Sequence, residues 1–145
     1  MAYLLDTNIL SELRKKDRAV PTVLAWFRSV NETEIFLSVL VVGEIRRGVE
    51  LRRRRDPQTA RNLDRWLTGL VRQFASRILP VSLEIADSWG QLCPDEQLPS
   101  IDGLLAATAL EHDLVLVTRN VADVQRAGVQ LLNPFEPLPL PGMGP

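Results

Sequence analysis

Short apolar runs, several of them rich in β-branched or aromatic residues, alternate along the chain with longer segments of helical periodicity. Runs of this kind are typical of buried strands when polar residues bound them. They lie at residues 3–5, 35–37, 78–81, 114–117 and 129–132. Strands that alternate with helices predict a parallel sheet covered by helices on both faces. The pattern therefore indicates an α/β fold.

Prolines and small polar residues mark where the intervening helices begin, because Ser and Asp cap a helix and Pro is tolerated in its first turn. We expect the first helix to begin near Thr7 and to end before Asp17. The other predicted starts are at Pro21, Ser38, Asp56 with Pro57, Ser82, and Ser100 after Pro99. The last of these helices is expected to be well buried through its apolar residues, which are Leu104, Leu105, Ala107, Ala109 and Leu110.

The C-terminal segment NPFEPLPLPGMGP is too rich in Pro and Gly to join a sheet or a helix, so we expect it to be extended or disordered. We therefore place one domain at residues 1–134 and a Pro-rich tail at residues 135–145.

Composition narrows the setting of the protein. A chain of 145 residues with 46% hydrophobic content can bury the core of one domain without disulfides. The single cysteine, Cys93, cannot form an internal disulfide, and His112 has no companion for a Cys/His zinc site, which favours a reducing, cytoplasmic location. No apolar stretch reaches the roughly 20 residues that span a bilayer. The net charge of −1 predicts neither nucleic-acid nor membrane binding by itself.

Four acidic residues follow or approach predicted strand ends. Asp6 ends the first apolar run, and Glu44 lies on the helix that leaves the second. Asp102 is in the first turn after Ser100, and Asp123 follows the strand LVLVT across the short loop RNVA. Ligands of open parallel sheets bind beyond the carboxyl ends of the strands. We therefore expect these carboxylates to converge at one edge of the sheet.

Like charges at close range oppose folding, and a divalent cation removes that cost. Oxygen ligands without nearby Cys or His suit Mg²⁺ or Mn²⁺, which would activate water for attack on a phosphodiester. The direct ligands are predicted to be Asp6 and Asp102. The polar neighbours that would orient these ligands or bind a phosphate are Thr7, Asn8, Thr118 and Asn120.

Arginines concentrate on two consecutive predicted helices although the chain as a whole is slightly acidic. They are Arg46, Arg47, Arg52, Arg53, Arg54, Arg55, Arg61 and Arg65. Consecutive arginines repel one another and add little to helix stability, so contact with a polyanion is an alternative to a merely solvated face. The residues predicted to contact RNA are Arg46, Arg47, Arg52, Arg53, Arg54 and Arg55. Contact with a partner protein is the rival interpretation.

The segments LLDTNIL, SVLVVGEIRRG and SIDGLLAATALEHDLVLVTRN, followed by Asp123, resemble the PIN-domain proteins of the VapC or FitB type. The resemblance covers residues 2 to 134. It implies an α/β/α sandwich around a parallel sheet of four to five short strands, and a homodimer. It also implies a Mg²⁺- or Mn²⁺-dependent ribonuclease that is the toxin of a type II toxin–antitoxin pair, inhibited by a VapB-like antitoxin. The acidic tetrad would be Asp6, Glu44, Asp102 and Asp123, with Thr118 and Asn120 near the metal.

Other interpretations of the same residues stay open. Asp6 is also a good helix cap, and Asp102 and Asp123 taken singly are ordinary acids of a first helical turn and a loop. Asp6 as a phosphorylated nucleophile is disfavoured, because such sites generally need a second acid two positions later and a late lysine, and position 8 is Asn. A module that binds nucleic acid or a partner without catalysis is the remaining alternative.

Overall fold

A computed structural model describes residues 1–92, 94, 98–125 and 128–137. Its centre is a five-stranded sheet with the order β3-β2-β1-β4-β5, in which every neighbouring pair of strands is parallel. The strands are β1 (Tyr3–Leu5), β2 (Ile35–Ser38), β3 (Ile78–Leu79), β4 (Val115–Val117) and β5 (Leu131–Leu132). The predicted α/β fold with a central parallel sheet is confirmed.

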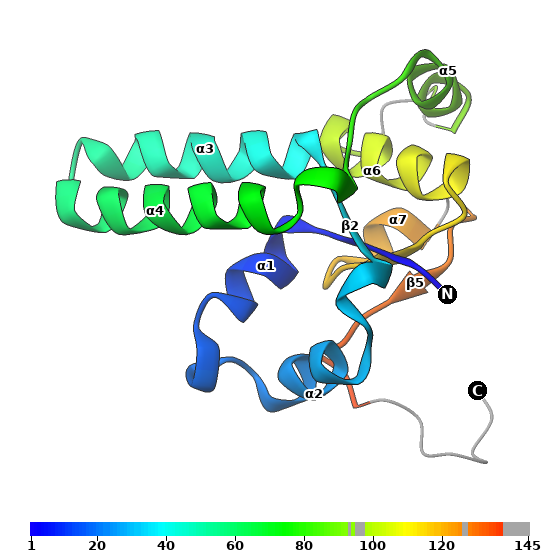
Figure 1. Cartoon of the computed structure of the whole chain (residues 1–145). Coiled ribbons are helices and arrows are strands. Elements are labelled where there is room, and N and C mark those ends of the chain that lie inside the picture. The colour runs from blue at the N-terminus through cyan, green and yellow to red at the C-terminus, as the bar shows by residue number, and fades with distance from the viewer. Residues whose placement is uncertain (93, 95–97, 126–127, 138–145) are drawn as a thin grey trace.

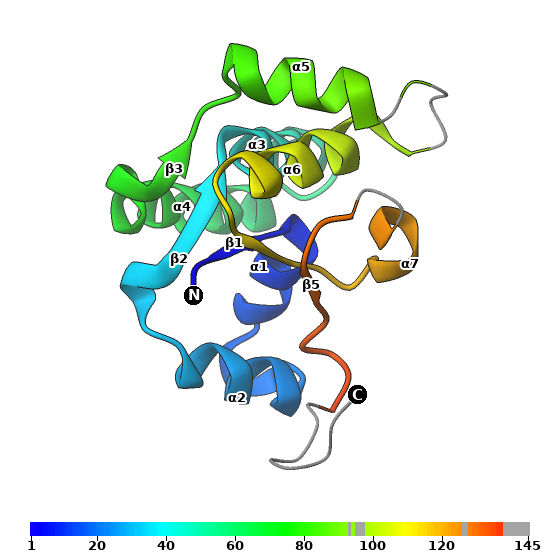
Figure 2. The ribbon, with the colours of Figure 1, turned by 90° about the vertical axis from the view of Figure 1, so that its right-hand side faces the viewer.

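Helices flank the sheet, and α1 and α2 lie on the opposite side of it from α5 and α6 (Figure 2). Their bounds are α1 (Thr7–Leu13), α2 (Pro21–Ser29), α3 (Val39–Arg53), α4 (Pro57–Gln73), α5 (Leu83–Leu92), α6 (Ser100–Glu111) and α7 (Val121–Val124). Short 3-10 turns lie at Lys16–Arg18, Glu32–Glu34 and Ala75–Arg77. None of the helices in the described ranges combines the length and the apolar character needed to cross a membrane.

The central strands are buried because helices cover both faces of the sheet. Leu4, Leu5 and Leu37 have no exposed surface, and Leu116 has 1%. Each of these residues belongs to one continuous core that extends into the helices. Burial on both faces explains why the strands appear in the sequence as unbroken apolar runs rather than as alternating ones.

Helices α3 and α4 form a long hairpin that projects beyond the sheet (Figure 1). Ser38 caps α3 by accepting a hydrogen bond from the backbone N–H of Leu40 at 3.1 Å. Asp56 caps α4 through the N–H of Thr59 at 3.2 Å, and Pro57 occupies the first turn. These start signals lie where the sequence predicts them, so the hairpin is encoded locally at both of its helix starts.

The structure corrects several expectations about α6 and the tail. Helix α6 begins at Ser100 itself, Pro99 is the capping residue, and no side chain caps the helix. Leu110, predicted to be buried, is 39% exposed because it lies on the outer face near the end of α6. The start of the tail is ordered rather than extended. Asn133 accepts a hydrogen bond from the N–H of Phe135 at 3.0 Å, and the Phe135 carbonyl accepts one from the Thr22 hydroxyl at 3.3 Å.

Some expectations fall outside what the structure describes. Cys93 and residues 138–145 of the tail are not among the described residues. The domain boundary at residue 134 stays a prediction.

Candidate functional site

The candidate site lies at the carboxyl edge of the sheet, between β1 and β4. At this point the order in which the chain adds strands to the sheet changes sides. The chain proceeds outward from β1 to β2 and β3, and then returns past β1 to add β4 and β5 on its other side. Asp6 follows β1 and Thr118 follows β4, the two strands that meet at this switch point. Such a point leaves a crevice in which parallel α/β proteins bind their ligands.

The Asp6 carboxylate is buried and held by three donors. Its Oδ1 atom accepts a hydrogen bond from the backbone N–H of Thr7 at 2.7 Å, which makes Asp6 the cap of α1. Its Oδ2 atom accepts the Thr118 hydroxyl at 2.8 Å and the Asn8 amide at 3.4 Å. Capping alone uses only one of its oxygen atoms. The second is oriented by Thr118, which follows β4, and by Asn8 of α1, so the side chain does more than begin a helix.

Glu44 is brought to the same place by Thr7. The Thr7 hydroxyl donates to Oε1 of Glu44 at 2.7 Å, while the Thr7 N–H donates to Asp6. Glu44 is half-buried on α3, nearly two turns beyond the Ser38 cap. A single threonine therefore joins two carboxylates from distant parts of the sequence.

Basic partners of these two carboxylates are absent from the part of the chain that the structure describes. Within the residues that the structure describes, no lysine or arginine lies at ion-pair distance from Asp6 or Glu44. Two partly desolvated negative charges with hydrogen-bond donors but no counter-ion make a site that favours a cation.

The polar neighbours tie the two strands and α1 together. Thr118 accepts the Asn8 amide at 3.3 Å and the backbone N–H of Asn120 at 3.1 Å. The Asn8 carbonyl oxygen in turn accepts the N–H of Arg119 at 3.2 Å. Thr7, Asn8 and Thr118 therefore contact the acids as side chains, whereas Asn120 joins the network through its backbone.

The structure describes less of the two remaining acids of the predicted tetrad, Asp102 and Asp123. Asp102 is half-buried in the first turn of α6, as expected. Asp123 lies in the short helix α7 rather than in a loop, and its side chain is outside the description. Among the described side chains, no three acids, histidines or cysteines form a group that could hold a metal. The assignment of Asp102 and Asp123 to a metal site stays a prediction.

The predicted arginine cluster divides into paired and unpaired residues. Arg46 binds Asp64 at 2.9 Å, and Arg53 binds Glu50 at 2.8 Å and Asp64 at 3.3 Å. The two pairs with Asp64 fasten α3 to α4. The other predicted residues are exposed, and they are Arg47, Arg52, Arg54 and Arg55. RNA contact by this set stays a prediction.

Sequence reasoning missed Glu12, which is only 7% exposed. Its carboxylate accepts the N–H of Val20 at 3.0 Å and pairs with Lys15 at 3.0 Å, so it fastens α1 to the start of α2. Burial raises the pKa of Glu12, but the hydrogen bonds from Lys15 and Val20 and the charge of Lys15 outweigh burial and lower the pKa overall. The signal was an acid three residues after the buried Ile9, on the apolar face of a helix.

Comparison with known proteins agrees with this architecture. The PIN domain family matches residues 3–128. VapC ribonuclease Y4jK of Sinorhizobium fredii is 33% identical over 141 residues, which are 92% of this chain and 97% of that protein. Toxin FitB of Neisseria gonorrhoeae is 32% identical over 138 residues, or 91% and 97% of the two chains. The structure of FitAB bound to the IR36 DNA fragment matches with a TM-score of 0.84 at 29% identity, covering 94% of this chain and 97% of that one. The chain therefore belongs to the PIN-domain family, and its relatives include toxins of the VapC and FitB type.

Proposed function

We propose that this protein is a metal-dependent endoribonuclease and the toxin of a type II toxin–antitoxin pair. Its reaction would be hydrolysis of RNA phosphodiesters by activated water. The names of the relatives support the reaction and the system, since one is called a VapC ribonuclease and another is the toxin FitB. A VapB-like antitoxin, a homodimer and a cytoplasmic location belong to the same proposal.

The observation that carries the proposal is the pair of carboxylates joined through Thr7 at the switch point of the sheet. Asp6 and Glu44 each use one oxygen atom to accept a bond from Thr7. A purely structural role would be served by one acid, or by an acid paired with a base. Two acids without a basic partner in the described structure are more economically explained by a cation.

The donor set fits Mg²⁺ or Mn²⁺. All the side-chain atoms that Asp6, Glu44 and Asp102 offer are hard carboxylate oxygens, and neither Cys nor His was predicted for the site. Asp6 and Asp102 would hold the ion directly, with Glu44 and Asp123 completing the acidic set. When bound, the ion would lower the pKa of a coordinated water and stabilise charge on the leaving oxygen.

The protein's own residues would keep the acids in place for that chemistry. Thr118 and Asn8 hold Oδ2 of Asp6, and they come from opposite sides of the switch point. Thr7 holds Glu44 while its backbone holds Asp6. Because these donors are fixed by a strand and a helix start, the carboxylates are oriented before any substrate arrives.

Cleavage of RNA by the purified protein tests the proposal. We expect activity with Mg²⁺ or Mn²⁺, loss of it in excess EDTA, and a loss of at least about 100-fold in Asp6→Asn and Glu44→Gln. Asp17→Asn and Glu111→Gln change the same chemical groups at exposed positions and should keep full activity. Circular dichroism would check that all four variants are folded.

Two results would contradict the proposal. Full activity of Asp6→Asn, or activity that survives EDTA, would exclude the metal mechanism. RNA binding without cleavage in any divalent cation would favour the non-catalytic binding module instead.

A further inference from the structure

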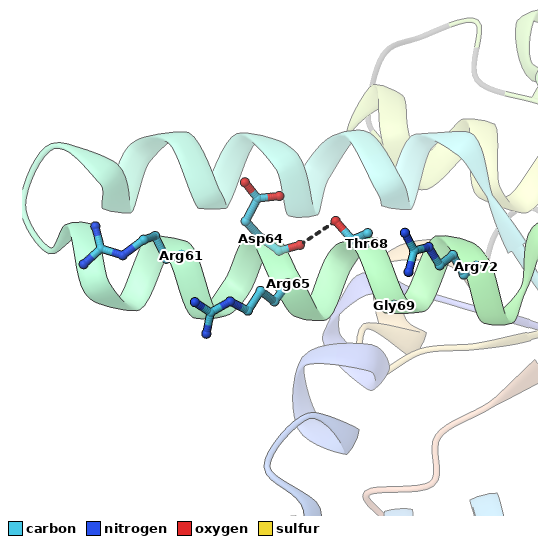
Figure 3. Close-up of a pocket in the computed structure, with 6 residues that line it drawn as sticks. All are labelled: Arg61, Asp64, Arg65, Thr68, Gly69 and Arg72. Atoms are coloured by element: carbon cyan, nitrogen blue, oxygen red, sulfur yellow. Dashed lines mark hydrogen bonds between the residues drawn. The ribbon is translucent and has the colours of Figure 1, made fainter.

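An open groove of about 540 Å³ runs along the outer face of α4, away from the acidic site. Figure 3 shows the residues that line it. They are Arg61, Asp64, Arg65, Thr68, Gly69 and Arg72. The groove contains no large apolar side chain, so its character is set by charge.

The one acid of the groove is already neutralised. Asp64 binds Arg46 at 2.9 Å and Arg53 at 3.3 Å, and its carboxylate points toward α3 rather than outward (Figure 3). Its hydrogen bond with Arg46 holds the pKa of Asp64 below its usual range. Arg46 and Arg53 also share Glu50, at 3.6 and 2.8 Å. Two acids and two arginines thus form a cluster of zero net charge between the helices.

The other three arginines are left as surplus positive charge. Arg65 and Arg72 form no ion pair with any described residue. Arg61 donates to the neutral Gln58 at 2.7 Å. The nearby Asp56 carboxylate is bonded to Thr59, whose hydrogen bonds lower its pKa more than the charges of Arg52 and Arg61 do. These three arginines, which we call the α4 arginine stripe, are exposed.

Helical spacing places the stripe on one face. Arg61, Arg65, Thr68 and Arg72 follow one another at intervals of four, three and four residues, which align along a helix. At about 1.5 Å per residue the stripe is about 16 Å long.

Gly69 keeps the floor of the groove open. A side chain at this position would meet no atom within 4 Å, so packing does not require glycine here. Glycine inside a helix costs about 1 kcal/mol relative to alanine. A bare backbone between Arg65 and Arg72 lets an extended polymer lie close to the helix.

We propose that the α4 arginine stripe binds the phosphate backbone of the single-stranded RNA substrate; this inference rests on the proposed function. Arginine suits phosphate because its planar guanidinium binds two oxygen atoms at once. The lining of this groove holds no apolar side chain that could form the centre of a protein interface, although an apolar groove lined by Val39, Val42, Leu67 and Val71 adjoins it at Thr68 and Arg72. Binding of a protein partner is therefore one outcome of the test.

The test measures binding separately from cleavage. The probe is a short fluorescein-labelled oligouridylate, titrated with the full chain carrying Asp6→Asn, which removes the proposed catalysis. The test variant adds Arg61→Gln, Arg65→Gln and Arg72→Gln. The matched control adds Lys16→Gln, Arg18→Gln and Arg28→Gln, which remove the same charge from exposed positions outside the α3–α4 hairpin and outside the predicted RNA contacts. Urea unfolding checks that both remain folded.

We expect the stripe variant to lose roughly tenfold in affinity. Its slope of log K against log salt should fall by about two, as three phosphate contacts to a single strand require. The control should lose less than about threefold. With an otherwise wild-type site, the stripe variant should raise KM for RNA and leave kcat unchanged.

Three results would overturn the inference. They are no measurable binding of the probe, an equal loss in both triple variants, and a larger loss in the control. If the stripe variant kept its affinity for RNA but lost the binding of an acidic protein partner, the stripe would be a protein-binding site and not an RNA-binding site. RNA bound through the stripe but not cleaved by the wild type would refute the proposed function and leave this inference standing.

Discussion

Replacing Thr118 by valine tests whether the hydrogen-bond network at the switch point holds the Asp6 carboxylate. Thr118 is 1% exposed, and its hydroxyl donates to Oδ2 of Asp6 at 2.8 Å. Valine has nearly the same shape, so the change removes three hydrogen bonds with little loss of packing. A hydrogen bond to a charged group contributes about 1.5–3 kcal/mol.

We therefore expect Thr118→Val to lower the free energy of unfolding by about 2–3 kcal/mol. For a domain of this size that corresponds to a fall in unfolding temperature of roughly 5–10 °C. Thr118→Ser retains the hydroxyl and should recover most of the loss. If the proposed function holds, RNA cleavage should follow the same order among the variants.

Thr108→Val is the matched control for this experiment. Thr108 is fully buried, and its hydroxyl donates to the Leu104 carbonyl at 2.7 Å within α6. That carbonyl keeps its backbone donor, so no polar atom is left without a partner and the cost should stay below about 1 kcal/mol. Urea denaturation of both variants measures the difference. Equal destabilisation by the two substitutions would refute the reasoning, because burial of a threonine would then explain both.

Two further predictions concern acids outside the site. Glu12→Gln should cost about 1–3 kcal/mol at neutral pH. The folded-state pKa of Glu12 is lowered, so the stability difference between wild type and Glu12→Gln should shrink as the pH falls below the ordinary value of about 4.3. Unfolding experiments from pH 7 to pH 3 measure this difference. A difference that stays constant over this range would contradict the reasoning. Asp56→Ala removes the cap of α4 and should lower the unfolding temperature by a few degrees, whereas Asp56→Ser, which still caps, should restore it; equal melting of the two variants would argue against capping.

The sheet could be predicted because its signals are local. The strand at Tyr3–Leu5 is observed as predicted. A short unbroken apolar run between polar residues typically forms a buried strand in an α/β domain of this size. Strands β3 and β5 are shorter than the apolar runs that predicted them. The length of a strand depends on how far its neighbouring strand extends, because the two must pair by hydrogen bonds. The sequence of one segment alone therefore does not predict where its strand ends.

The site was predictable where it depends on strand ends and less so where it depends on helix orientation. Asp6, Asn8 and Thr118 meet because their strands are adjacent and parallel, which follows from the α/β pattern. The contact between Thr7 and Glu44 needs α3 to leave β2 at a particular angle, and the sequence gives only the direction of that helix. Glu12 escaped notice for the same reason, because its partner Val20 belongs to the next helix.

The arginines show most clearly what sequence alone cannot supply. A run of neighbouring arginines at Arg52–Arg55 draws attention in the sequence, yet α3 ends at Arg53 and the run crosses from the helix into the turn before α4. Which arginines carry free charge depends on where the acids lie, and Asp64 and Glu50 neutralise Arg46 and Arg53 only because α4 packs against α3. Surplus charge is a property of the folded pair of helices. Arg61, Arg65 and Arg72 keep their charge and lie in line along α4, so that one face of the helix offers a polyanion several contacts.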